Sequence, residues 1–163
     1  MSETNSCREY LAAYCLGDNG CDLGFGGFRP IVDNAICVDR SKEFSEWPLH
    51  LFLDLSNLPF KDNSLAWNFS SHALEDFEDT TATIKEWVRV LKPGGNLVLF
   101  LPDQAAYEAH CAANGSSPNM GHKHKNFSLE FVKNRLPSNV KVIFEQWPVP
   151  YNPYSFALVV QKL

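Results

Sequence analysis

The sequence predicts one α/β domain over residues 1–163, built around a single doubly wound, mostly parallel sheet. Two patterns predict this class. Short apolar runs closed by turn-forming residues alternate with helical patterns, and residues 97–101 form a wholly apolar run of the kind that a parallel sheet buries on both faces. The length of 163 residues also suits one domain, since domains average roughly 150 residues.

The first half of the chain predicts a helix followed by four strands. Residues 5–16 place Cys7, Leu11 and Cys15 on one helical face, and Gly17 is a suitable residue to end that helix. The strands are expected at residues 21–25, 35–38, 49–53 and 65–69.

The second half predicts two helices and a hairpin. Ile84, Trp87 and Val88 share a helical face after Asp79 or Thr80 as N-cap, and Pro-Gly-Gly at 93–95 would terminate that helix. A second helix is expected at 128–136, behind a Ser128 cap. The remaining expected strands are 97–101, 140–147 and 155–160, the last two forming an antiparallel C-terminal hairpin around a Pro-rich turn.

Composition excludes several classes of partner. The chain has 14 Lys and Arg against 19 Asp and Glu, a net charge of −5, which argues against nucleic acid or an anionic membrane and favours small-molecule or protein partners, here a small-molecule substrate. No window approaches the ~18 apolar residues of a membrane span, and the N-terminus resembles no export signal. The 5 cysteines are odd in number and contain no C-x-x-C pair, so we expect a reduced, cytoplasmic setting.

Three acidic residues are expected at one edge of the sheet. Asp22, Asp39 and Asp54 lie near the ends of the first three predicted strands, and carboxyl ends of parallel strands meet at one rim. Asp39 follows Asp22 by 17 positions, close to the ~20 at which an acid binds ribose hydroxyls in nucleotide-binding sheets. Gly24 and Gly26 let backbone approach a ligand closely, and N–H groups opening the next helix could bind an anion.

The order and spacing of five motifs resemble class I S-adenosylmethionine (SAM)-dependent methyltransferases, most closely a compact, type 11-like branch. The motifs are Cys-Asp-Leu-Gly-Phe-Gly at 21–26, Val-Asp-Arg-Ser at 38–41, Asp-Leu-Ser-Asn-Leu-Pro-Phe-Lys-Asp-Asn-Ser at 54–64, Ser-His-Ala-Leu-Glu-Asp at 71–76 and Arg-Val-Leu-Lys-Pro-Gly-Gly at 89–95. The resemblance covers residues 21–103.

The resemblance implies a Rossmann-like methyltransferase fold, SAM as cofactor and S-adenosylhomocysteine as product. It implies that the loop at 24–26 approaches the methionine part of SAM, that Asp39 holds the ribose, and that Asp54 and the Leu55 amide read the adenine. The segment 69–72 would line the methyl-transfer site. The expected cofactor-binding residues are Asp22, Gly24, Phe25, Gly26, Asp39, Arg40, Asp54, Leu55, Ser70 and Ser71.

Three departures from the family pattern affect these expectations. Gly27-Phe28 stands where a third glycine is usual, and Pro30 limits any helix that follows. Asp39 and Asp54 are 15 positions apart, which hardly accommodates a helix and a strand. Finally, the family's common Glu-His after the fourth strand is Glu75-Asp76 here.

His72 is the candidate catalytic residue. Its expected place beside the transferred methyl group, with a near-neutral pKa, would suit a general base toward a hydroxyl. The alternative is a histidine that orients a loop or packs on the cofactor, since transfer to nitrogen or sulfur needs no base. Glu75 is interpreted as a capping residue of the turn that follows.

Three further sequence patterns are interpreted as loop or turn features. His110, Cys111, His122 and His124 have irregular spacing, which favours a solvated loop over a metal site. A sharper hypothesis makes residues 107–125 a substrate lid. Asn152-Pro153-Tyr154 resembles the motif with which some methyltransferases hold a base amine, but it lies at the wrong place and is interpreted as turn chemistry.

The sequence therefore predicts a SAM-dependent methyltransferase that acts on a small-molecule or sugar-like acceptor. The alternative is a SAM- or nucleotide-binding module without transferase activity, serving as a regulator or subunit partner, and a dinucleotide-dependent oxidoreductase is a weaker third hypothesis. Because the cofactor half ends near Asp103, acceptor specificity must come from short loops, chiefly 104–126, or from a second subunit such as a homodimer partner.

Overall fold

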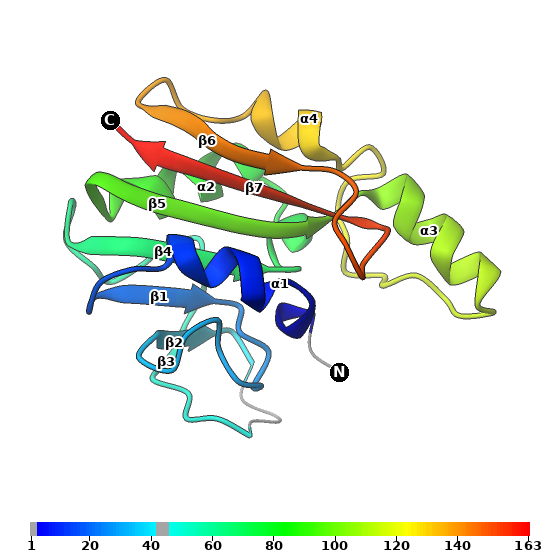
Figure 1. The fold of residues 1–163 in the computed structure, drawn as a ribbon, viewed down its shortest axis with the longest axis horizontal. Helices are drawn as coiled ribbons and strands as arrows, with labels where there is room; N and C mark the ends of the chain where they lie inside the picture. Colours follow the sequence, from blue (N-terminus) through cyan, green and yellow to red (C-terminus); the bar gives the residue numbers. More distant parts are fainter. Residues whose placement is uncertain (1–2, 42–45) are drawn as a thin grey trace.

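The computed structural model describes residues 3–41 and 46–163, which contain a seven-stranded sheet in the order β3-β2-β1-β4-β5-β7-β6 (Figure 1). The parallel strands are β1 (Gly20–Leu23), β2 (Ile36–Asp39), β3 (Leu51–Phe52), β4 (Leu65–Ser71) and β5 (Leu91–Pro102). β7 (Ser155–Lys162) runs antiparallel between β5 and β6 (Val140–Gln146). The predicted doubly wound, mostly parallel sheet with an antiparallel C-terminal hairpin is confirmed.

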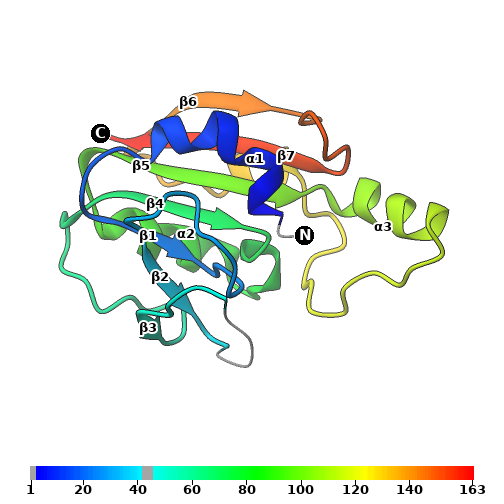
Figure 2. The ribbon, with the colours of Figure 1, turned by 60° about the horizontal axis from the view of Figure 1, so that its bottom comes forward.

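Helices cover both faces of this sheet. Helix α1 (Thr4–Leu11) lies on one face, and α2 (Thr80–Arg89) and α4 (Leu129–Lys133) lie on the other (Figures 1 and 2). Side chains of β5 alternate between the two cores: Leu97, Leu99 and Leu101 pack on the α2 side, and Val98 and Phe100 pack on the α1 side. Burial on both faces explains why this run is wholly apolar.

Three helices are shorter than the sequence predicts, and one of them is α4, which is expected over 128–136 but ends at Lys133. The α-helix α1 stops at Leu11 and continues as the 3-10 turn η1 (Ala12–Tyr14). Helix α2 is capped by Asp79, whose side chain accepts from the Ala82 N–H, and ends at Arg89. The Pro-Gly-Gly at 93–95 therefore lies inside β5, because Leu91 already pairs with Leu65.

The connections between the first three strands are irregular. Among the described residues, no helix lies between β1 and β3. This agrees with the expectation that Pro30 limits a helix after β1 and that the 15 positions between Asp39 and Asp54 leave little room for one. One consequence overturns an expectation: no helix begins after Gly24–Gly26, and the anion site at such a helix N-terminus is absent from the described residues.

Helix α3 (Gln104–Ala113) occupies part of the region expected to be a lid loop. The Asp103 side chain accepts from the Ala106 N–H and caps the helix. The interpretation of 107–125 as one loop is therefore wrong for its first third, and only the part after Ala113 lacks helix or strand. No helix in the described part of the chain is both long and apolar enough to cross a membrane.

Candidate functional site

A groove follows the carboxyl ends of the parallel strands, and three recesses make it up. The inner recess, about 150 Å³, is lined by Gly24, Asp39, Arg40, Leu55, His72 and Phe77, among others. The outer recess, about 370 Å³, shares Arg40 and Phe77 with it and adds Asp54. The N-terminal recess, about 230 Å³, shares Gly24 and His72 and adds Glu3, Phe25, Gly26 and Ser71. The shared lining residues place the outer and N-terminal recesses on either side of the inner one, and their position matches the ligand crevice of open α/β sheets.

Asp39 organises the turn after β1. Its Oδ2 accepts from the Gly26 N–H at 2.9 Å and its Oδ1 accepts from the Ser41 N–H at 2.8 Å, so the carboxylate is anchored on both oxygens. Gly24, at φ +73°, lies so close to Ala73 that an added Cβ would stand 2.6 Å from the Ala73 Cβ. The turn thus brings backbone from β1, β2 and the end of β4 together.

An ion pair joins the two sides of the groove. Arg40 Nη2 lies 2.9 Å from Asp76 Oδ2, and both residues line the inner and the outer recess. The Arg40 side chain is 55% exposed, and an exposed pair of this kind contributes only about 0–1 kcal/mol. A ligand can therefore displace it at small cost.

Trp87 supports the wall between the recesses. Its Nε1 donates to the Leu55 carbonyl at 2.8 Å, and its ring is nearly perpendicular to that of Phe77, with centroids 6.0 Å apart. Asp54, next in the chain to Leu55, is exposed and accepts from the Ser56 N–H, a bond that holds the pKa of its carboxyl below the usual range.

Two of the expected cofactor residues point away from the groove. Asp22 is fully buried, and its Oδ2 accepts from the Ile31 N–H at 2.8 Å. Burial raises the pKa of Asp22 to about 7. Ser70 is also fully buried and donates to the Leu23 carbonyl. Neither lines one of the three recesses. Ser71 does line the N-terminal recess.

His72 lies where the inner and N-terminal recesses meet. It has φ +49°, and its Nε2 is 2.8 Å from Ser155 Oγ at the start of β7. Burial, followed by the neighbouring His122, lowers the pKa of His72 to about 3. The near-neutral pKa expected from the sequence is therefore wrong, and the imidazole is neutral and weakly basic at pH 7.

Glu75 forms a buried cluster with two histidines. Its side chain is 1% exposed, and Oε1 lies 3.9 Å from His72 Nδ1 and 3.7 Å from His122 Nε2, beyond hydrogen-bond length. Burial raises the pKa of Glu75 to about 8, with Asp76 and Glu3 adding to the effect, and burial lowers the pKa of His122. All three groups are therefore uncharged at pH 7. The interpretation of Glu75 as a cap is wrong, since η2 (Leu74–Asp76) has no side-chain cap.

Replacing Glu75 by glutamine should change how stability depends on pH. The carboxyl is favoured in its protonated form, so its contribution to stability is complete below its usual pKa of 4.5 and is lost as the pH rises through about 8. We expect the stability of Glu75→Gln, relative to the wild type, to increase from pH 5 to pH 9 in urea denaturation. Asp22, with a raised pKa, also makes the wild type less stable as the pH rises, and His72, with a lowered pKa, does the opposite. Because both groups are present in the variant and in the wild type, their effects cancel when the two stabilities are subtracted.

Glu78→Gln is the matched control, because the Glu78 side chain is 87% exposed. Its difference from the wild type should stay flat over the same range. A flat difference for Glu75→Gln as well would show that Glu75 is ionised in the folded protein.

The remaining histidines do not converge. His122 Nδ1 is 2.7 Å from Gln104 Oε1, and His124 Nε2 is 3.0 Å from the Phe77 carbonyl. In residues 3–41 and 46–163, no group of three or more His, Cys, Asp or Glu side chains could hold a metal ion. All 5 cysteines are unpaired and buried.

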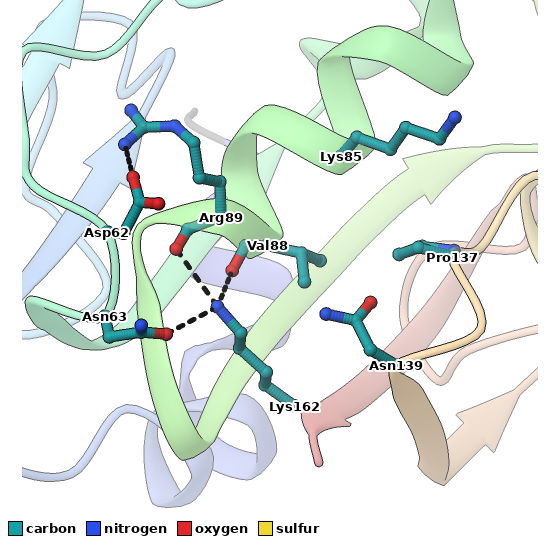
Figure 3. A pocket seen from close by; sticks show the side chains of 8 residues that line it. All are labelled: Asp62, Asn63, Lys85, Val88, Arg89, Pro137, Asn139 and Lys162. Atoms are coloured by element: carbon teal, nitrogen blue, oxygen red, sulfur yellow. Dashed lines mark hydrogen bonds and ion pairs between the residues drawn. The ribbon is translucent and has the colours of Figure 1, made fainter.

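A separate cavity of about 320 Å³ lies at the opposite, amino edge of the parallel strands (Figure 3). There the Lys162 ammonium donates to the carbonyls of Val88 and Arg89 and to Asn63 Oδ1. These bonds cap the end of α2, a structural use of the charge. None of the sequence-predicted site residues lines this cavity.

A comparison with protein families matches the stretch of chain that carries the sequence motifs described above. Residues 22–99 match the family model described as a methyltransferase domain. No curated protein matches the sequence.

Solved structures share the fold over almost the whole chain. A SAM-dependent methyltransferase from Mesorhizobium loti has 15% identity and a TM-score of 0.68, covering 98% of this chain and 100% of that one. The PH0226 protein of Pyrococcus horikoshii has 16% identity and a TM-score of 0.71, covering 98% and 89%. A chain from the Haloferax volcanii complex of the Trm112 methyltransferase activator with a candidate methyltransferase has 19% identity and a TM-score of 0.65, covering 99% and 90%. The domain match over residues 22–99 and the strand order together give this chain a methyltransferase-type domain with the Rossmann-like fold of SAM-dependent methyltransferases.

Proposed function

We propose that the chain transfers the methyl group of SAM to a small-molecule acceptor at the groove. The observation that supports this most strongly is that three neighbouring recesses lie around Gly24, Asp39 and His72 at this edge of the sheet. The residues fit the cofactor: Asp39 and Asp54 offer carboxylate oxygens to hydroxyl and amine donors, and the Ser71 Oγ has no hydrogen-bond partner among the described residues. When bound, SAM supplies a methyl group on a positively charged sulfur.

The groups near His72 favour an amine acceptor over a sugar-like hydroxyl. An efficient general base has a pKa near the working pH, whereas the pKa of His72 is about 3 and Glu75 is protonated at pH 7. A neutral amine brings its own lone pair. Its nitrogen forms the new bond to carbon, the electron pair of the broken carbon–sulfur bond stays on sulfur, and the proton of the product ammonium leaves to water. The chain then needs only to position the acceptor.

Calorimetric titration with SAM tests the cofactor site. The wild type should bind, and Asp39→Ala should bind at least about tenfold more weakly, because hydrogen bonds to a charged group contribute about 1.5–3 kcal/mol. Asp33→Ala is the matched control, since Asp33 is exposed and pairs with Arg29 outside the groove. Unchanged binding by Asp39→Ala would contradict the proposed role of Asp39.

The alternative, a SAM-binding module without transferase activity, has its own supporting observation. Neither His72 nor Glu75 is an ionised base at pH 7, and the Haloferax neighbour belongs to a complex with an activator. Incubation with SAM and a panel of amines, thiols and sugars separates the two. A transferase releases S-adenosylhomocysteine with at least one amine, whereas a binding module returns SAM unchanged. Light scattering on the same sample tests the expected homodimer.

A further inference from the structure

A glutamate from the N-terminal segment lines the N-terminal recess and is held there by the other end of the chain. Glu3 Oε2 accepts from Asn152 Nδ2 at 2.6 Å, and Glu3 Oε1 accepts from the Tyr154 hydroxyl at 2.9 Å. Asn152 is 3% exposed, and its Oδ1 has no hydrogen-bond partner among the described residues, so Glu3 is the partner that its amide group has. The Asn-Pro-Tyr turn, which the function has not yet explained, therefore positions a carboxylate at the groove.

The recess around Glu3 contains no positive partner for this carboxylate. None of the described side chains that line it is Lys or Arg, and His72 is neutral. Both bonds to Glu3 come from uncharged donors, which orient the carboxylate without neutralising its charge. A second polar group is also unused, because the Ser71 Oγ is buried, lines the same recess and has no hydrogen-bond partner among the described residues.

Asp22, a cofactor-binding residue expected from the sequence, forms its hydrogen bond elsewhere. Asp22 is buried under the turn and accepts from Ile31, so its carboxylate does not reach the recess. The recess nevertheless adjoins Gly24 and Gly26, the loop expected to approach the methionine part of SAM. Glu3 is therefore the only carboxylate among the described residues lining this recess.

We propose that the Glu3 carboxylate binds the ammonium group of the methionine part of SAM, with Asn152 and Tyr154 as positioning residues. The Ser71 hydroxyl is placed to donate to the carboxylate of the same amino-acid moiety. A charge-assisted hydrogen bond of this kind is stronger than one between neutral groups. This inference rests on the proposed function only in requiring that SAM binds in the groove.

The test compares three ligands by calorimetry: SAM, S-adenosylhomocysteine and 5′-methylthioadenosine, which lacks the amino-acid moiety. For Glu3→Gln we expect both SAM and S-adenosylhomocysteine to bind about tenfold to hundredfold more weakly, and 5′-methylthioadenosine to bind as to the wild type. Tyr154→Phe removes one positioning bond and should give a smaller loss of the same pattern. Glu9→Gln is the matched control, since Glu9 is an exposed glutamate of α1 outside the recess, and should change none of the three affinities.

Each other outcome overturns the proposal in a recognisable way. Loss of SAM affinity alone would assign Glu3 to the sulfonium, and equal loss of all three ligands would assign it to the shape of the groove. Unchanged affinities would remove Glu3 from the site. If the wild-type protein binds 5′-methylthioadenosine and SAM equally well, the ammonium is not recognised; if it binds none of the ligands, the proposed function itself fails.

Discussion

Trp87→Ala should destabilise the protein by about 3–5 kcal/mol, the usual cost of removing a buried Trp or Phe side chain. The Trp87 side chain is fully buried between α2 and the sheet. Typical domains have a free energy of unfolding of only about 5–15 kcal/mol, so this change uses much of the stability. Urea denaturation followed by circular dichroism measures the loss.

The same substitution should weaken SAM binding under conditions where the variant is still folded. Trp87 supports the Leu55 carbonyl through its Nε1 and supports Phe77 through ring packing, and both of these residues line the inner recess. Trp87→Phe separates the two effects. It retains most of the packing but leaves the Leu55 carbonyl without this donor, which costs about 1–3 kcal/mol.

Trp147→Ala is the matched control, because it also removes a tryptophan side chain, but one that is 42% exposed. Its cost should be well below that of Trp87→Ala. Equal losses at the two positions would contradict the assignment of Trp87 to the core that supports the groove.

Gly24→Ala should damage both stability and cofactor binding, through two separable causes. The backbone at φ +73° costs an L-residue about 1–2 kcal/mol, and the new Cβ would stand 2.6 Å from the Ala73 Cβ. Crowding of this kind costs a further 1–3 kcal/mol, roughly, and would push apart the ends of β1 and β4. We expect the sum in urea denaturation and a large loss of SAM affinity in calorimetry.

Two companion variants divide the effect. Gly26→Ala has φ +67° but its new Cβ would meet only Phe28, at 3.9 Å, so it should show the backbone cost alone. Gly24→Ala combined with Ala73→Gly removes the clash and should recover the second part. If the double variant is no more stable than Gly24→Ala, the close approach of the two strand ends is not the cause.

The parts of the fold that local patterns specify could be predicted from the sequence. The spacing of Ile84, Trp87 and Val88 predicts α2, and the apolar run at 97–101 predicts β5, an interior strand buried on both faces. Helix α3 was missed because its alanines give no strong apolar face, although Asp103 was available as a capping signal. Helix ends were misplaced where a strand pairing, such as Leu91 with Leu65, decides the boundary.

Most of the expected cofactor residues line the groove, and two of them do not. Gly24, Phe25, Gly26, Asp39, Arg40, Asp54, Leu55 and Ser71 all line the groove, as their positions after the strands suggested. Asp22 and Ser70 each lie one position before the last residue of their strand, and successive side chains of a strand point to opposite faces of the sheet. Motif matching alone does not show which oxygen atoms are already bonded within the protein.

By itself, the sequence determined the resemblance to methyltransferases, the sheet with its antiparallel hairpin and the edge that carries the proposed SAM site, because each depends on short-range spacing along the chain. Only the tertiary structure decided the chemistry of that edge. Burial makes His72 a weak base and keeps Glu75 protonated, and both effects arise from residues distant in sequence, such as His122. The contact between Glu3 and the Asn152–Tyr154 turn joins positions 149 to 151 residues apart, a proximity that only the packing of α1 and the hairpin around one sheet can create.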